Sequence, residues 1–317
     1  MIQDIEPHEY RNEYQPLKPD KDSIFLAYRG RTILAAMEGR QIHFPTFDEM
    51  EAYMGKQKLY EDYTYLFAID GMRFYLGNPL GISEEDQDID FRKIKGYEML
   101  DTQTLREGGP KYLNFAGVTG WQLHRWYTSR RYCGRCGSPM VKDAKERMMF
   151  CPECHLMEYP KISPAVIIAV TDGNRILMSK YAGREYKKYA LLAGFNEIGE
   201  TIEETVKREV MEEVGLQVKN ITYYKSQPWS FSDTLLMGFF CQLDGEDKIT
   251  LDQEELALAQ WFEREEIPVK EDDLSPVSYT HLPADFPDRI SCRQWQRDRY
   301  SLRIVSVCPY RLPFRQM

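Results

Sequence analysis

The first part of the chain has the apolar pattern of short strands. Five apolar or aromatic runs predict strands, at residues 23–28, 31–37, 40–43, 63–69 and 72–76. The last two flank Asp70-Gly71, a pair that favours a two-residue hairpin turn. An apolar stripe with a period of about 3.6 residues then predicts a helix from Asn114, which is placed to cap it, to about Ser129. We therefore expect residues 1–130 to form a β-rich domain with a scaffold or dimerisation role, since no residue in it suggests chemistry.

From residue 165 the pattern is that of a mixed domain of strands and helices. The β-branched run 165–171 suits a buried strand, and 175–179 follows the turn 172–174 as its hairpin partner. Further strands are expected at 191–193, 221–226, 235–243 and 258–262. A helix is expected from about Thr201 to Val214, with Gly215 as its stop and an apolar side made of Ile202, Val206, Val210 and Val214. This order of elements predicts a mixed sheet covered by helices.

Composition excludes several classes of protein. A length of 317 residues suits two or three domains, and the net charge of -9 argues against a protein that grips long stretches of nucleic-acid backbone. There is no run of about eighteen apolar residues, which excludes a membrane-spanning helix, and the polar start excludes a secretory signal. Seven cysteines, four of them in two tight pairs, make a poor disulfide framework, so we expect a protein of the reducing cytoplasm.

The last 39 residues, 279–317, differ from the rest of the chain in composition. They hold seven arginines but no lysine or glutamate, whereas the preceding chain is rich in both. Two explanations are open: a poorly ordered natural extension, or a change of reading frame or of sequence assembly near Ser278. Composition favours the second explanation.

Three glutamates point to a divalent cation. Glu209, Glu212 and Glu213 stand three and four residues apart in the predicted helix, so their carboxylates share one face. Like charges at this spacing repel by a few tenths of a kcal/mol per pair, and a bound cation offsets that repulsion. The alternative is an acidic helix face that is simply solvated.

Four cysteines have the spacing of a zinc ribbon. Two Cys-x-x-Cys pairs are separated by fourteen residues, and together they comprise Cys133, Cys136, Cys151 and Cys154. Four thiolates on two knuckles make the closed tetrahedral site of a structural zinc ion. Free buried thiols or two disulfides are the alternatives. A ribbon of this kind also occurs in nucleic-acid and protein-binding modules, so by itself it does not indicate an enzyme.

The stretch 194–216 resembles the Nudix box, G-x5-E-x7-R-E-U-x-E-E-x-G-U with U aliphatic. Every specified position matches: Gly194, Glu200, Arg208, Glu209, Val210, Glu212, Glu213, Gly215 and Leu216. The resemblance implies an α/β/α sandwich and a catalytic Mg²⁺ or Mn²⁺ ion. It implies that Glu209, Glu212 and Glu213 act in catalysis, with Arg208 as an orienting residue. The implied metal ligands are the carbonyl of Ala193 and the carboxylates of Glu209, Glu213 and a later glutamate.

A second segment narrows the resemblance to the zinc-containing NAD(H) diphosphatases. Residues 226–234 read S-Q-P-W-S-F-S-D-T, similar to the S-Q-P-W-x-F-x-x-S of that family, with Ser232 in place of a common proline and Thr234 in place of serine. The later metal-binding glutamate maps to Glu255, with Glu254 as the alternative. The implied substrate contacts are Glu146, Tyr159, Gln227, Pro228, Trp229, Ser230, Phe231, Ser232, Asp233 and Thr234. Without the resemblance, Trp229 and Phe231 are equally well explained as core aromatics.

The resemblance covers about residues 110–278 and predicts both organisation and activity. The expected parts are a β-rich domain (1–130), a zinc ribbon (131–160), a Nudix domain of α+β class (161–278) and the atypical tail (279–317). The implied reaction is hydrolysis of the NAD(H) pyrophosphate to AMP and nicotinamide mononucleotide, with removal of NAD caps from RNA 5′ ends by some members. The family is typically homodimeric. Hydrolysis of ADP-ribose or a related compound is one alternative, and a non-catalytic nucleic-acid-binding regulator is another.

Overall fold

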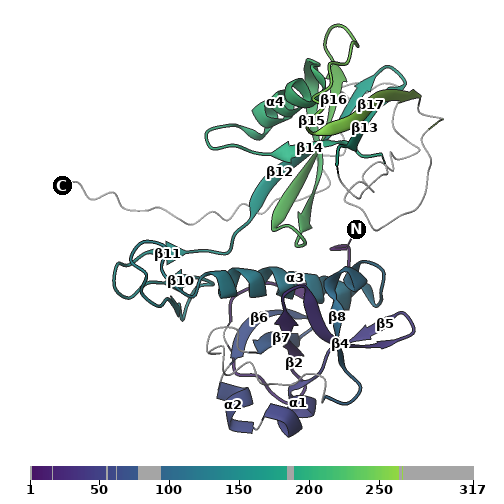
Figure 1. The fold of residues 1–317 in the computed structure, drawn as a ribbon. Coiled ribbons are helices and arrows are strands. Elements are labelled where there is room, and N and C mark those ends of the chain that lie inside the picture. The colour runs from purple at the N-terminus through teal and green to yellow at the C-terminus, as the bar shows by residue number, and fades with distance from the viewer. Residues whose placement is uncertain are drawn as a thin grey trace, which may run out of the picture. The chain divides into compact units, whose positions relative to one another are not determined.

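The computed structural model describes residues 2–15, 17–54, 56–61, 63–77, 94–183, 189–263 and 266 (Figure 1). The atypical tail, residues 279–317, lies outside these described residues, and so does the position near Ser278 at which the composition changes. Among the described residues, no helix is both long enough and apolar enough to cross a membrane.

The N-terminal region contains two small sheets. One has the strand order β1-β6-β7-β2, and the other joins β3, β4 and β5 with β8 paired to β4. Their bounds are β1 Tyr10–Arg11, β2 Ile24–Leu26, β3 Tyr28–Arg29, β4 Thr32–Glu38, β5 Gln41–His43, β6 Tyr63–Ile69, β7 Met72–Gly77 and β8 Glu98–Asp101. The predicted hairpin is confirmed, since Asp70 and Gly71 both have positive φ, as this type of turn requires.

The sequence prediction is wrong at two places in this region. The single strand expected at 23–28 is split, because β2 pairs in parallel with β7 while β3 pairs antiparallel with β4 in the other sheet. Two helices, α1 (Phe47–Met54) and α2 (Lys56–Glu61), were not expected. A local signal for α1 was present, because the Thr46 hydroxyl and the Glu49 carboxylate exchange hydrogen bonds with each other's backbone N–H in a capping box.

The predicted long helix is present but begins earlier than expected. Helix α3 spans Lys111–Ser129, with Pro110 at its N-cap and a 3-10 helix, η3 (Thr102–Arg106), before it. Asn114 is therefore not the cap. Asn114 lies within the first turn of the helix, and its buried side chain donates a hydrogen bond to the carbonyl of Gly108. Proline suits a helix start because the first turn needs no donor from its backbone nitrogen.

The zinc-ribbon segment shares its core with the N-terminal region. Its three short strands are β9 (Val141–Lys142), β10 (Met149–Phe150) and β11 (Met157–Glu158), with β10 in the middle. Met149 and Cys151 are fully buried in the same apolar cluster as side chains of α3 and of the N-terminal sheets. The stability of the ribbon and that of the N-terminal region are consequently linked.

The later part of the chain forms one six-stranded mixed sheet. Its order is β15-β16-β12-β13-β17, with β14 also paired to β12; β12 and β16 are parallel and the other pairs antiparallel. The bounds are β12 Ser163–Asp172, β13 Arg175–Tyr181, β14 Leu192–Phe195, β15 Val218–Trp229, β16 Thr234–Leu243 and β17 Leu256–Glu263. Strand β15 is longer than the predicted 221–226, because its pairing with β16 continues as far as Trp229.

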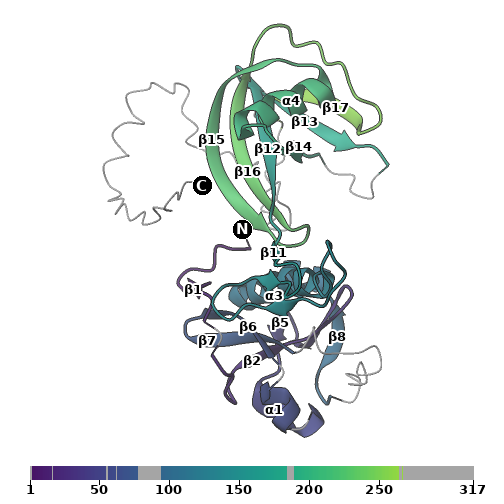
Figure 2. The ribbon, with the colours of Figure 1, turned by 90° about the vertical axis from the view of Figure 1, so that its left-hand side faces the viewer.

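Helix α4 (Ile202–Val214) covers one face of this sheet (Figure 2). Val206, Val210 and Val214 are fully buried against strand residues such as Val166 and Ile168, as the four-residue spacing predicts. Both ends of the helix are fixed. Thr201 and Glu204 form a capping box at the start, and Gly215 ends the helix with a φ of 68°. The predicted α+β class with a mixed sheet is confirmed; a second helical layer is not among the described residues.

Candidate active site and zinc site

The box glycine and the first box glutamate of α4 lie in direct contact. A Cβ atom added to Gly194 would lie 1.9 Å from the carboxylate carbon (Cδ) of Glu209 and 2.0 and 2.1 Å from its two carboxylate oxygens. No residue with a side chain fits there while Glu209 keeps this position. Gly194 thus lets the Glu209 carboxylate lie against the strand β14, which also carries Ala193.

The three glutamates of the helix occupy different environments. Glu209 and Glu213 are buried, with only 8% and 2% of their surface exposed. The Glu212 side chain is 59% exposed. The spacing in the sequence did not separate them. Since burial of an ionised carboxylate is costly unless it is compensated, Glu209 and Glu213 are the pair that indicates a functional requirement.

Arg208 holds the carboxylates in place, and its predicted hydrogen bond to Glu212 is present. Its Nη1 donates to Glu209 Oε1 at 2.8 Å and to Glu212 Oε2 at 2.9 Å. Its Nε donates to Glu200 Oε1 at 2.6 Å, and Nη2 donates to the carbonyl of Phe195 at 2.9 Å. The guanidinium therefore ties the helix to the loop and to the end of β14.

These contacts have opposite effects on two pKa values. The hydrogen bonds from Arg208 lower the pKa of Glu200 to about 2. Burial raises the pKa of Glu209, and the negative charges of Glu212 and Glu255 add to this effect, although Arg208 opposes it. Glu200 therefore stays ionised. Burial disfavours the ionised form of Glu209, and a bound cation would stabilise that form.

The donor set fits Mg²⁺ or Mn²⁺ in kind, since these ions prefer carboxylate and carbonyl oxygens. Glu209 and Glu213 supply buried carboxylates, and the raised pKa of Glu209 is what an additional positive charge would relieve. Glu255 acts electrostatically on Glu209, whereas Glu254 donates its backbone N–H to Asp252 Oδ1 at 2.8 Å in a local turn. The choice of Glu255 over Glu254 as the later ligand stays a prediction.

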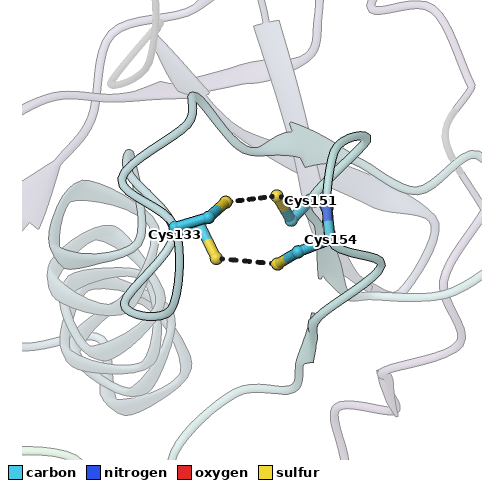
Figure 3. Close-up of side chains that lie close together, drawn as sticks. Cys133, Cys151 and Cys154 are labelled. Carbon is cyan, nitrogen blue, oxygen red and sulfur yellow. Dashed lines mark hydrogen bonds between the residues drawn. The ribbon is translucent and has the colours of Figure 1, made fainter.

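The four cysteines converge on one point (Figure 3). All four sulfur atoms lie within 4.8 Å of one another; Cys133 and Cys154 are 3.4 Å apart, and Cys136 and Cys151 are 3.5 Å apart. Within the described part of the chain, no other set of three or more His, Cys, Asp or Glu side chains has its ligand atoms already gathered around one point in this way. The separations are close to those of thiolates around one tetrahedral zinc ion, so the site fits zinc with no position open for a substrate.

The two knuckles that carry the cysteines repeat one backbone arrangement. In each, the residue after the second cysteine donates its N–H to the carbonyl of the first, from Gly137 to Cys133 and from His155 to Cys151. Gly137 and His155 both have positive φ, at 78° and 59°. The same Cys-x-x-Cys spacing thus gives the same local turn in both knuckles.

The segment 227–234 forms the end of the β15–β16 hairpin. Trp229 pairs with Thr234, and Thr234 pairs with Ser163 of β12. Gly194 pairs three residues further along β12, with Val166, so Trp229 lies about 10 Å along the sheet from the register of the box glycine. Sequence reasoning could not supply this offset.

The two aromatic residues of the segment are not equivalent. Phe231 packs against the core of the N-terminal region, with its ring 6.3 Å from that of Trp121. Both rings are partly exposed, and the Arg106 guanidinium lies 5.4 Å from the Trp229 ring and 5.6 Å from the Phe231 ring, so the packing of Phe231 on the core is what distinguishes the two. The explanation as a core aromatic thus suits Phe231 better than Trp229. Gln227, Ser230 and Thr234 are buried, whereas Pro228 is exposed.

Glu146 and Tyr159, both predicted to contact the substrate, lie next to each other. The Tyr159 hydroxyl donates to Glu146 Oε2 at 2.7 Å, and this hydrogen bond raises the pKa of the tyrosine. Both side chains are exposed. No contact places this pair beside the glutamates of α4 among the described residues.

Comparison with known proteins identifies the family. Residues 129–159 match the NADH pyrophosphatase zinc ribbon domain, and residues 161–284 match the NUDIX domain. The NAD-capped RNA hydrolase NudC of Klebsiella pneumoniae is 37% identical over 179 residues, 56% of this chain and 68% of that protein. Its namesake from Pectobacterium atrosepticum is 43% identical over 192 residues, 61% of this chain and 70% of that protein. The chain belongs to the Nudix family.

Solved Nudix hydrolases are also similar to part of the chain. A crystal structure of a Nudix hydrolase from Nitrosomonas europaea aligns with 44% of this chain and 80% of that chain, at 26% identity and a TM-score of 0.38.

Within this Nudix chain, one exposed aromatic residue beside the box glycine was not among the predicted site residues. Phe195 directly follows the box glycine, and 55% of its surface is exposed. It pairs with Ala165 of β12, which pairs with Leu236 of β16. Leu236 in turn pairs with Gln227 of β15, so Phe195 and Gln227 lie at the same level of the sheet.

Substitution of a zinc ligand should destabilise this Nudix protein well beyond the ribbon. We expect Cys151→Ser to lose the zinc ion, about one per chain in the wild type, and to lower the melting temperature by about 10 °C or more, because Cys151 belongs to the shared core. Elemental analysis and calorimetry measure the two effects. Cys241→Ala, which alters a buried thiol outside the ribbon, is the control and should retain zinc. A Cys151→Ser protein that melts at the wild-type temperature would contradict the assignment.

Proposed function

We propose that this chain hydrolyses the pyrophosphate of NAD(H), giving AMP and nicotinamide mononucleotide, and that it removes NAD caps from RNA 5′ ends. The observation that carries the proposal is the buried Glu209 carboxylate, held over Gly194 by Arg208 beside the buried Glu213. The names of the relatives support the choice of substrate, since both are NAD-capped RNA hydrolases, and the match of this chain to the NADH pyrophosphatase zinc ribbon domain supports it as well.

The residues of the chain have separate tasks in this proposal. Glu209, Glu213, Glu255 and the Ala193 carbonyl hold the divalent cation, and Glu212 and Arg208 complete the catalytic group. When bound, Mg²⁺ or Mn²⁺ neutralises phosphate charge and lowers the pKa of a coordinated water. Arg208 fixes the direction of the carboxylates through its three donor nitrogens. The protein thus contributes positioning and a preformed electrostatic environment.

The bases of the dinucleotide need flat apolar surfaces. Trp229 is a partly exposed and Phe195 an exposed aromatic on the sheet against which the glutamate helix α4 packs, so we assign them to base stacking. The remaining residues of 227–234, together with Glu146 and Tyr159, contact the substrate in this proposal. A homodimer and a cytoplasmic location, both implied by the resemblance, also stay proposals.

The decisive experiment is an assay of AMP release from NADH with Mn²⁺. Release of AMP and nicotinamide mononucleotide in equal amounts is expected. A chain that hydrolyses ADP-ribose but not NADH would indicate the alternative Nudix activity. A chain that hydrolyses neither substrate, although it holds zinc, would favour the non-catalytic regulator. A 5′-NAD-RNA oligonucleotide, followed by conversion to 5′-monophosphate RNA, tests cap removal separately.

Loss of a stacking surface should weaken catalysis on the dinucleotide. We expect Trp229→Ala to lower kcat/KM for NADH by about ten- to a hundredfold, since stacking on an aromatic contributes roughly 1–3 kcal/mol per base. Steady-state kinetics with NADH and with ADP-ribose measure the effect. Tyr223→Ala, on the same strand and also exposed, is the control and should retain activity. An equal, small effect of Trp229→Ala on both substrates would mean that the tryptophan only packs.

A further inference from the structure

The turn that joins β15 to β16 is held by one arginine from α3. Arg125 donates from Nη2 to the carbonyl of Ser230 at 2.9 Å, and the same nitrogen pairs with the carboxylate of Asp233. The turn comprises residues 230–233, between Trp229 and Thr234. One guanidinium therefore contacts both ends of the turn.

The arginine is itself held in position. Its guanidinium carbon lies 4.3 Å from the centre of the Trp121 ring, one helical turn earlier on α3, and Trp121 is buried. The side chains of Arg125 and Asp233 are only 32% and 24% exposed, so solvent screens this ion pair less than one at the surface. A charge-assisted hydrogen bond in such a setting is stronger than a neutral one.

The sequence of the turn explains why the contacts of Arg125 are needed to hold it in one conformation. Ser232 does not restrict the backbone φ as a proline would. Asp233 has a φ of 57°, a left-handed conformation that aspartate tolerates better than most residues. Two further hydrogen bonds of the turn are local, from Ser232 N–H to the Trp229 carbonyl at 3.2 Å and between the hydroxyls of Ser232 and Thr234 at 2.9 Å. A third comes from β12, where Ser163 N–H donates to the Asp233 carbonyl at 2.7 Å and leaves the Asp233 side chain and the Ser230 end of the turn to Arg125.

One of the two aromatic residues to which we assign base stacking lies beside this turn. Trp229 precedes the turn directly, and Phe231 lies within it, 5.1 Å from the Trp229 ring. A turn that moves would shift both rings. Small displacements of groups that position a substrate can cost a large factor in efficiency.

We propose that Arg125 is a positioning residue, which fixes the 230–233 turn through Ser230 and Asp233 and so sets the direction of Trp229 toward the dinucleotide. Its kinetic consequence rests on the proposed function. The mechanical part of the proposal does not, because the order of the turn can be measured without any substrate.

The test uses the full chain with Arg125→Ala, Arg125→Lys, Asp233→Asn and the double variant Arg125→Ala/Asp233→Asn. For Arg125→Ala we expect KM for NADH to rise about tenfold while kcat stays within about threefold, since binding and not the carboxylate group is affected. Arg125→Lys should recover part of the loss. Asp233→Asn keeps a residue suited to positive φ, and it should add little to Arg125→Ala because both act through one contact.

Hydrogen exchange gives the readout that is independent of activity. Peptides covering 227–234 should exchange faster in Arg125→Ala, and peptides of α4 should not change. Arg130→Ala is the matched control, since Arg130 follows α3 and makes a 3.6 Å ion pair with Glu158. Arg130→Ala should alter neither KM nor exchange at 227–234.

Two results would overturn the proposal. Unchanged exchange at 227–234 in Arg125→Ala would show that the arginine does not order the turn. Faster exchange together with an unchanged KM in an active enzyme would show that the order of the turn does not matter for the substrate. If the wild type fails to hydrolyse NADH, the proposed function fails instead, and exchange alone decides whether Arg125 orders the turn.

Discussion

Glu213→Gln should reduce turnover by at least two orders of magnitude while the protein stays folded. Glu213 is 2% exposed and lies one helical turn beyond Glu209 on the buried side of α4. The amide keeps the size of the side chain but removes the charge that a divalent cation requires. Loss of one of several crowded negative charges should leave the stability unchanged or slightly raised. NADH hydrolysis under saturating Mn²⁺ and a thermal melt measure the two parts.

Glu203→Gln is the matched control for this substitution. Glu203 stands in the first turn of the same helix and is exposed, so its amide variant should keep nearly full activity. If a folded Glu213→Gln protein keeps more than about a third of the wild-type turnover, the role of this helix is wrongly assigned.

Gly194→Ala should abolish most of the activity at little cost in stability. The added methyl group would overlap the Glu209 carboxylate, with 1.9 Å to its carbon atom. These atoms form the end of a flexible side chain, so Glu209 can turn away without moving the backbone. The displaced carboxylate can then no longer serve the site, and we expect a loss of about a hundredfold or more. Steady-state kinetics measure the turnover, calorimetry the melting temperature and titration the affinity for Mn²⁺. We expect the melting temperature to change least.

Gly134→Ala serves as the control, because a Cβ atom there meets nothing within 4 Å. A Gly194→Ala protein that is fully active would show that Glu209 does not need its present position. A variant that is largely unfolded would show that the glycine serves the sheet and not the carboxylate.

The site was predictable where its chemistry is encoded by local spacing. The glutamates, Arg208 and the capped ends of α4 follow from offsets of three and four residues within one helix. The cysteines follow from two short repeats whose backbone hydrogen bonds are the same. In each case the atoms that interact are a few residues apart, so tertiary structure adds little to the pattern.

The rest of the site depends on register and burial, which a single sequence does not display. The different exposure of Glu212 and Glu213 arises from how the sheet meets α4. The place of Trp229 depends on a pairing with Thr234 that extends β15 beyond its apolar run. Similarly, the division of residues 23–28 between two sheets results from partners far along the chain.

The single parallel pairing in the later sheet has a consequence for how this enzyme is made. Ser163 of β12 pairs with Thr234 of β16, 71 positions later (234 minus 163), and the whole glutamate helix lies in the connection between them. Contacts so distant in sequence form slowly, because the entropy cost of closing the loop comes before the favourable energy of the strand pairing. During synthesis, α4 therefore leaves the ribosome before β16 and Leu256, which complete the apolar cluster around its buried valines. We expect a nascent chain that stops within β16 to be open to proteases at the 194–216 segment, and protection there should appear only once residue 256 has emerged.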